Sequence, residues 1–273
     1  MSDDKNNSIE QWLSSQEKHG EDVELSVIIP AYNEQWRLPT TLIDIIDYFD
    51  RSSLSHEIIV VDDGSSDETE QVVRKFERIC PHLRLVRLPK NYGKGHAVRT
   101  GMLSARGKYL LFTDADGSTP IKEIERLFDA VHQGGAEIAI GSRAMESEDT
   151  LVETVWYRKF LGRTFHFFVH SILLPGFHDT QCGFKLFTKP AARFVFSRQR
   201  ANGFSFDLEI LHLAQKAELT ISEVPVNWTN VAGSKVNLLT DAAKMFKDLF
   251  VFRIRNAGVS SEDFQHAHQE KST

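Results

Sequence analysis

Five apolar runs of strand length constrain the fold of this chain more than any other feature. They are LSVIIP (25–30), EIIVVDD (57–63), LRLVRL (83–88), KYLLFTD (108–114) and AEIAIGS (136–142). The runs are nearly continuous rather than alternating, which is typical of strands buried on both faces of a mostly parallel sheet. Segments in which apolar residues recur with the period of a helix, such as residues 35–50, lie between these runs. The sequence therefore predicts an open α/β sheet, mostly parallel, with helices on both faces.

Polar clusters follow the same five runs: PAYNE, DDGSSD, KNYGKGHA, DADGS and GSR. In open α/β sheets, ligands bind at the carboxyl ends of the strands. The preference of turns for polar residues would explain a single cluster of this kind. It explains five clusters at one edge of the sheet less easily. We therefore expect a binding site at this edge of the sheet.

Helix-capping residues, and the periodic spacing of apolar residues in the second half of the chain, predict the remaining elements. Ser65 and Glu68 have capping-box spacing, and Thr119 is the expected cap of a helix with Pro120 in its first turn. Residues 154–173, 205–217 and 238–256 predict helices, and ISEVPVNW predicts a strand. The polar residues 257–273 predict a flexible, solvated tail.

Composition narrows the classes of partner. The 273 residues are 41% hydrophobic, enough for one large core, and the net charge of −6 gives no electrostatic footprint for nucleic acid. Residues 1–22 are polar and do not resemble a signal peptide. No window reaches the ~18 consecutive apolar residues of a spanning helix. We expect a cytoplasmic protein that is soluble or lies on a membrane surface.

Asp114 and Asp116 follow the fourth run at positions i and i+2, so their side chains fall on the same side of a strand. Two adjacent carboxylates repel each other, and Mg²⁺ or Mn²⁺ relieves that repulsion while taking further ligands from phosphate groups. The alternative is that the two aspartates only shape a turn.

Two other motif interpretations stay open at this point. DADGST resembles the nucleophile loop of haloacid-dehalogenase-type phosphotransferases, but that loop follows the first strand and here it follows the fourth. VVDDGS and FTDADG resemble the acidic sites of phosphorelay receivers. A receiver, however, is complete in ~120 residues and has no place for VIIPAYNE.

The order of the motifs favours another family. VIIPAYNE, IIVVDDGSSDET, NYGKGHAVRTG and LLFTDADGS resemble the inverting family 2 glycosyltransferases, which have a GT-A fold with a Rossmann-like nucleotide-binding half. The later GSRA, DTQCGFKLF, FDLEIL and VNWTNVAGSKVNLLTDAAKMFKDL are similar to the dolichyl-phosphate β-glucosyltransferases, whose close relatives are the dolichyl-phosphate mannosyltransferases. Eukaryotic members begin with a membrane-anchoring helix, which this sequence lacks. The QxxRW motif of processive synthases is also absent, which favours transfer of a single sugar.

The resemblance implies a donor site in residues 23–143. Its expected members, which contact the base, the ribose and the diphosphate of UDP-glucose, are Pro30, Ala31, Tyr32, Glu34, Asp63, Lys94, Asp114 and Ser118. Asp63 would accept the N3–H of uracil. Asp114 and Asp116 would hold Mg²⁺ or Mn²⁺ on the diphosphate, with Asp116 the most direct ligand and a catalytic residue.

The resemblance also implies an acceptor half, residues 144–256, which completes a domain of residues 23–256. A polyprenyl (dolichyl) phosphate is already ionised and needs no general base, but it needs cations. The candidates are Arg143, Arg158, Arg163 and Lys235. Arg143 and Asp207 are the further catalytic candidates, and Asp207 with Glu209 lies where related enzymes carry a base.

The expected function is transfer of one hexose from UDP-glucose to a polyprenyl phosphate at the cytosolic face of a membrane. Residues 154–173 and 238–256 would lie in the interface, the second through its apolar side chains and the cations Lys244, Lys247, Arg253 and Arg255. Packing of both helices on the sheet is the alternative. For the function, the alternatives are a GDP-mannose donor, a phosphotransferase or receiver that uses Asp114 as phosphoacceptor, and a silent nucleotide-binding module.

Overall fold

A seven-stranded sheet forms the centre of the computed structural model, which describes residues 23–145, 150–153, 168–231 and 238–269. The strands lie in the order β3-β2-β1-β4-β7-β5-β8. Their bounds are β1 Leu25–Ala31, β2 His56–Asp62, β3 Leu83–Arg87, β4 Tyr109–Thr113, β5 Ile138–Ser142, β7 Phe184–Thr188 and β8 Ile221–Pro225. The five predicted apolar runs are thus β1 to β5.

Strand β7 runs antiparallel between β4 and β5, while β1 to β4 are parallel to one another and β5 pairs in parallel with β8. The mostly parallel sheet is confirmed. No local pattern in the sequence indicates that β7 lies inside the sheet. Residues Val152–Glu153 (β6) and Trp228–Thr229 (β9) form a small second sheet.

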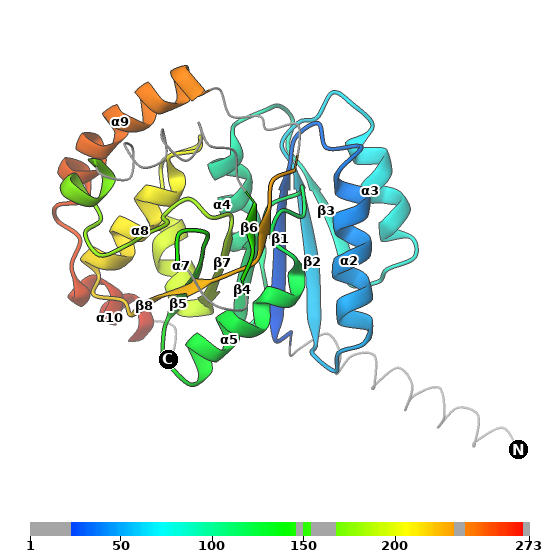
Figure 1. The fold of residues 1–273 in the computed structure, drawn as a ribbon, viewed down its shortest axis with the longest axis horizontal. Helices are drawn as coiled ribbons and strands as arrows, with labels where there is room; N and C mark the ends of the chain where they lie inside the picture. The colour runs from blue at the N-terminus through cyan, green and yellow to red at the C-terminus, as the bar shows by residue number, and fades with distance from the viewer. Residues whose placement is uncertain (1–22, 146–149, 154–167, 232–237, 270–273) are drawn as a thin grey trace, which may run out of the picture.

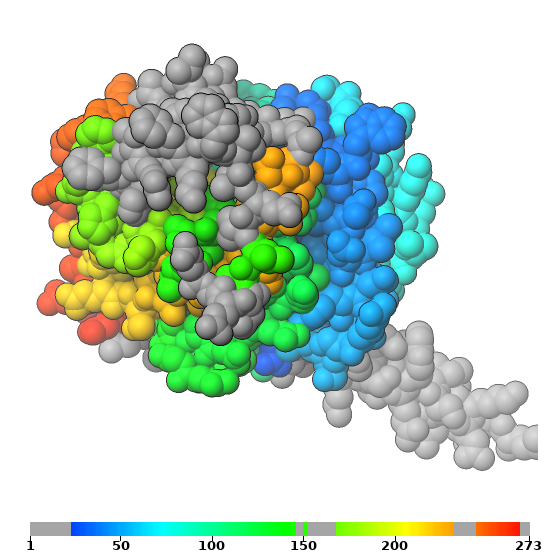
Figure 2. Space-filling model, viewed as in Figure 1, coloured from blue at the N-terminus to red at the C-terminus, as the bar shows by residue number. Residues whose placement is uncertain are grey.

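Helices cover both faces of the main sheet (Figure 1). On one face lie α2 (Leu38–Asp50), α3 (Thr69–Glu77), a 3₁₀ turn (Ile121–Glu123) and α5 (Ile124–His132). On the other lie α4 (Lys94–Ser104), α7 (Lys189–Arg198), α8 (Phe206–Lys216) and α9 (Leu238–Arg255). Strand β1 serves both cores, because Ile28 joins one and Val27 and Ile29 join the other. In space-filling view the first third of the chain occupies one side of the molecule and the later residues the other (Figure 2).

Three predicted helix starts are wrong. The helix expected from residue 35 begins at Leu38. Helix α3 begins at Thr69, and Ser65 does not cap it, because its hydroxyl accepts the backbone N–H of Asn33 across the loop. Thr119 caps no α-helix either, since a 3₁₀ turn separates it from α5.

The flexible tail predicted after residue 256 is wrong over much of its length. Residues Ser261–Gln269 form α10, and its Phe264 packs edge-on against Phe194 of α7, with ring centroids 5.3 Å apart. The apolar Phe264 and Ala267, three positions apart on one side of α10, pack against the core. None of the helices in the described ranges is long and apolar enough to cross a membrane.

Candidate active site

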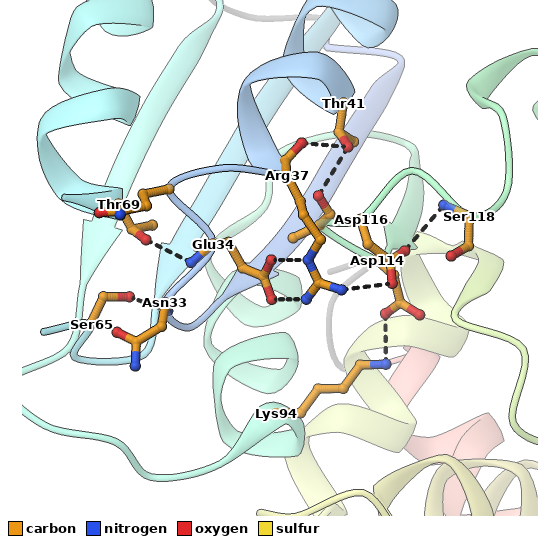
Figure 3. A network of polar contacts seen from close by, with 12 residues as sticks. Asn33, Glu34, Arg37, Thr41, Ser65, Thr69, Lys94, Asp114, Asp116 and Ser118 are labelled. Atoms are coloured by element: carbon orange, nitrogen blue, oxygen red, sulfur yellow. Dashed lines mark hydrogen bonds and ion pairs between the residues drawn. The ribbon is translucent and has the colours of Figure 1, made fainter. Parts of the chain in front are cut away.

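The loops that follow β1, β2 and β4 meet at the carboxyl edge of the sheet, where the sequence predicted a site (Figure 3). The first two are joined by hydrogen bonds. The backbone N–H of Asn33 donates to Ser65 Oγ at 2.9 Å, and that of Glu34 donates to Thr69 Oγ1 at 2.8 Å. Asn33 has a left-handed backbone, with φ of 53°, and its side chain accepts the N–H of Ser66. These bonds fix the turn that carries Glu34.

The predicted donor residues of β1 lie at the start of this turn. Pro30 and Ala31 end the strand and are buried, while the Tyr32 side chain is partly exposed beyond them. Glu34 is buried and points toward the acidic pair (Figure 3). The chain therefore places the Glu34 carboxylate close to the loop that follows β4.

Asp114 and Asp116 converge with cationic side chains. Lys94 Nζ, at the start of α4, lies 2.6 Å from Asp114 Oδ1. Burial acts to lower the pKa of Lys94, but the charges of Asp114 and Asp207 and the hydrogen bond to Asp114 together outweigh it, so the pKa is raised. The backbone N–H of Ser118 donates to Asp116 Oδ1 at 3.1 Å. The structure thus brings together Glu34, Lys94, Asp114, Asp116 and Ser118, as the sequence predicted.

Arg37 belongs to this cluster and was missed. Its Nε and Nη2 donate to the two carboxylate oxygens of Glu34, with 2.7 Å between Nε and Oε2. Its Nη1 lies 3.7 Å from Asp116 Oδ2. The hydrogen bond to Glu34 raises the pKa of Arg37. The sequence did contain a signal for the pair of Glu34 and Arg37. Oppositely charged residues three positions apart at a helix can form an ion pair, and these two residues lie where a helix begins.

The acidic pair suits a hard divalent cation that shares its ligands with phosphate. In the described ranges, no group of three or more His, Cys, Asp or Glu side chains could hold a metal on its own. Mg²⁺ and Mn²⁺ sites of the nucleotide-binding kind use one or two carboxylates and complete the shell with phosphate and water. Gly183 leaves room for Asp114, since a Cβ there would lie 2.1 Å from Asp114 Oδ2. The residues present fit such an ion.

Asp63 lies beneath the loop that leads into α4. Its two oxygens accept the backbone N–H groups of Tyr92 and Gly93, each at 2.8 Å. Burial raises the pKa of Asp63 despite these two donors. In the structure this carboxylate holds the loop before Lys94.

Asp207 is buried behind the cluster and pairs with Lys185 of β7. Lys185 Nζ lies 2.5 Å from Asp207 Oδ1 and donates to Cys182 O at 2.6 Å. Burial raises the pKa of Asp207 against the opposing charge of Lys185. Glu209 accepts the N–H groups of Arg200 and Ala201 and pairs with Arg255, so it stabilises a turn.

Arg143 is held by a carboxylate that sequence reasoning had not paired with it. Its Nε and Nη2 donate to Asp179 at 2.7 and 2.9 Å, and its backbone N–H donates to the same side chain at 3.0 Å. Although burial acts in the opposite direction, the charge of Arg143 holds the pKa of Asp179 well below its usual value. The other expected phosphate ligands, Arg158, Arg163 and Lys235, lie outside the described residues.

Comparison with known proteins identifies the family. A model described as Glycosyl transferase family 2 matches residues 26–196, more than half of the chain. A dolichyl-phosphate beta-glucosyltransferase of Dictyostelium discoideum is 42% identical over 246 residues, 86% of this chain and 75% of that protein. The Homo sapiens protein of the same name is 38% identical over 244 residues, 85% and 75% of the two chains. The Saccharomyces cerevisiae one is 38% identical over 271 residues, 92% and 81%.

Solved structures show the same fold at low identity. Glucosyl-3-phosphoglycerate synthase from Mycobacterium tuberculosis, in complex with Mn²⁺, UDP-glucose and phosphoglyceric acid, gives a TM-score of 0.62 at 18% identity, covering 89% of this chain and 82% of that one. Mannosyl-3-phosphoglycerate synthase from Rubrobacter xylanophilus gives 0.65 at 17% identity, with coverage of 86% and 75%. The fold is GT-A. The chain is therefore a glycosyltransferase of family 2 and belongs to the family of the dolichyl-phosphate beta-glucosyltransferases.

Proposed function

We propose that this enzyme transfers one glucose from UDP-glucose to a dolichyl or other polyprenyl phosphate, with a divalent cation and with inversion at the anomeric carbon. The observation that carries the proposal is the convergence of Asp114 and Asp116 with Lys94 and Arg37 at the carboxyl edge of the sheet. The names of the relatives support the acceptor and the sugar. The neighbour bound to Mn²⁺ and UDP-glucose supports the donor and the metal.

In this proposal the loops after β1, β2 and β3 hold the nucleotide. Asp63 fixes the loop at Tyr92 and Gly93, and the backbone there approaches the base and ribose. Lys94 lies at the N-terminus of α4, where a diphosphate is favoured by both the side chain and the helix. Mg²⁺ or Mn²⁺ held by Asp114 and Asp116 would offset the negative charge that develops on the leaving diphosphate.

The acceptor provides its own nucleophile. A phosphate monoester has a second pKa near ~6, so its oxygen is ionised at neutral pH and attacks without a general base. Attack from the face opposite to the departing UDP gives inversion. The buried Asp207 accordingly needs no proton-transfer role, and we assign it the positioning of Lys185 beside the cluster. Arg143, held in one orientation by Asp179, is the described cation that we assign to the acceptor phosphate.

Helix α9 divides its apolar residues between the core and the surface. Met245, Leu249 and Phe252 are buried, whereas Phe250 is 48% and Ile254 79% exposed. Lys244 and Lys247 are also exposed on this helix. We propose that its outer face rests on the cytosolic surface of a membrane, since an apolar face flanked by cations suits anionic lipid. Residues 154–167 of the other segment predicted to lie in the interface, 154–173, are outside the described residues.

The test is a transfer assay with labelled UDP-glucose or GDP-mannose, a polyprenyl phosphate and either Mg²⁺ or Mn²⁺. We expect label from UDP-glucose in the organic phase, lost on chelation and in Asp116→Asn. Stereochemistry of the product, read from the anomeric proton coupling, reports inversion. If label is transferred from GDP-mannose and not from UDP-glucose, the donor is GDP-mannose. A phosphate covalently trapped on Asp114 would overturn the proposal.

A further inference from the structure

Each carboxylate of the acidic pair already has a cationic neighbour. Lys94 Nζ lies 2.6 Å from Asp114 Oδ1, and Arg37 Nη1 lies 3.7 Å from Asp116 Oδ2. The guanidinium of Arg37 is not free to swing away, because two of its nitrogens donate to Glu34. Arg37 is thus fixed between two acidic groups, as Figure 3 shows.

The charges in this cluster are close to balance without any bound ion. Three carboxylates, Glu34, Asp114 and Asp116, face two cations, Arg37 and Lys94, which leaves one net negative charge. Behind them, Lys185 and Asp207 neutralise each other. A divalent cation that arrives alone therefore meets positive charge close to both of its ligands, and like charges at this range oppose binding.

We propose that Arg37 is a built-in counter-ion that keeps Asp116 from binding a divalent cation until a nucleoside diphosphate is present, so that metal and donor bind together. This inference rests on the metal-dependent function proposed above. The diphosphate restores the balance, because its negative charge offsets the incoming cation. It also offers Arg37 phosphate oxygens, which guanidinium groups bind as they bind carboxylates.

Thermodynamic linkage gives the proposal a measurable form. If the diphosphate raises the affinity for the cation, the cation must raise the affinity for the diphosphate by the same factor. Removing the charge of Arg37 should strengthen binding of the cation alone and so reduce this coupling. If Arg37 only oriented Glu34 or Asp116, its replacement would not strengthen binding of the cation alone.

The experiment measures Mn²⁺ binding by electron paramagnetic resonance, without and with UDP. The variants are Arg37→Gln, Arg37→Met and Arg37→Lys. Arg74→Gln is the matched control, because Arg74 also pairs with two carboxylates, Glu70 and Glu77, but on helix α3. Wild type and Arg74→Gln should bind Mn²⁺ weakly alone and tightly with UDP. Arg37→Gln and Arg37→Met should bind Mn²⁺ alone on the order of tenfold more tightly, and Arg37→Lys should follow wild type.

The outcomes separate this inference from the function on which it rests. Equal Mn²⁺ affinity of Arg37→Gln, Arg37→Met and Arg74→Gln in the absence of UDP would overturn the inference alone. The same holds if Arg37→Lys behaves as Arg37→Gln, since shape rather than charge would then matter. Asp116→Asn must abolish Mn²⁺ binding, and retained binding places the ion elsewhere. If wild type binds no Mn²⁺ even with UDP, the metal-dependent function itself fails.

Discussion

Lys185 Nζ and Asp207 Oδ1 lie 2.5 Å apart, and the lysine side chain has no exposed surface. The pair joins β7, the antiparallel strand, to the N-terminus of α8. Water cannot replace either partner at this depth. The link therefore ties α8 to the strand that pairs with β4, next to Asp114 and Asp116.

Removing one member of this pair should destabilise the fold strongly. Lys185→Met leaves the Asp207 carboxylate buried without its counter-ion, which costs about 3–5 kcal/mol for such pairs. Urea unfolding measures the loss. The double variant Lys185→Met, Asp207→Leu should recover much of it. Equal losses in the single and double variants would mean that packing, and not charge, is responsible.

Asp63→Ala should lower both stability and UDP affinity. The substitution leaves the partly buried N–H groups of Tyr92 and Gly93 without their acceptor, and the about 1–3 kcal/mol that a fully buried donor costs is the upper limit for each. The loop that precedes Lys94 then loses its support. Thermal unfolding and UDP calorimetry test this together. Weaker UDP binding at unchanged stability would instead assign Asp63 to the base alone.

Gly183→Ala should impair transfer far more than it impairs folding. The added Cβ would lie 2.1 Å from Asp114 Oδ2, and the exposed carboxylate yields more easily than the strand beside it. We expect kcat/KM to fall by roughly a hundredfold, as for other small displacements of reacting groups. Gly258→Ala is the control, because nothing lies within 4 Å of its Cβ. If Gly183→Ala transferred sugar as efficiently as wild type, Asp114 would not be held against Gly183 in the active enzyme.

His212 should make stability depend on pH between about 6.5 and 4. Burial, followed by the charge of Lys216, lowers its pKa to about 4. Because the folded protein keeps this imidazole neutral, its contribution is complete above the unfolded pKa near 6.5. It is lost as the pH falls toward 4, by up to ~3 kcal/mol.

Unfolding free energies of wild type and His212→Leu at pH 7 and pH 4.5 test this effect. The variant should lose less stability than wild type on acidification. His178→Gln, which removes an exposed imidazole, serves as the control. Parallel losses in wild type and His212→Leu would show that His212 does not titrate in this range.

Helix α9 should contribute to binding of anionic vesicles through Lys244 and Lys247. Arg253 and Arg255, which the sequence placed on the same basic face, are engaged by Ile172 O and Glu209. Lys244→Gln with Lys247→Gln should weaken co-sedimentation with phosphatidylserine vesicles by about 2 kcal/mol at low salt. Lys75→Gln with Lys122→Gln changes the net charge equally at exposed positions elsewhere. Equal binding by the two double variants would exclude a specific role of α9.

The sequence predicted what local patterns encode. Continuous apolar runs identified β1 to β5, and the i, i+2 spacing of Asp114 and Asp116 identified the acidic pair, because both signals lie within a few residues. Arg37 shows the limit of this reasoning. Its pairing with Glu34 is local, but its approach to Asp116 depends on β1 lying beside β4.

Contacts between segments that are far apart in the chain could not be predicted from local sequence patterns. Arg143 was expected to be available for a phosphate, and its partner Asp179 lies 36 positions later. The capping-box spacing of Ser65 and Glu68 was real, but a contact with Asn33 in another loop used the hydroxyl. For Ser65, a tertiary contact took a hydroxyl that local spacing had assigned to a helix cap.

The position of β7 also bears on how this enzyme can be assembled and recombined. Strand β5 has its two neighbours, β7 and β8, in later parts of the chain: Ile138 lies opposite Phe187 on one side and Ile221 on the other. On the ribosome, β5 therefore emerges with neither partner available. A chimera joined at residue 143 would separate β5 from both, and unpaired strand edges promote aggregation. The residues before and after position 143 consequently build one sheet, and we expect changes in the loops to preserve folding better than an exchange of halves.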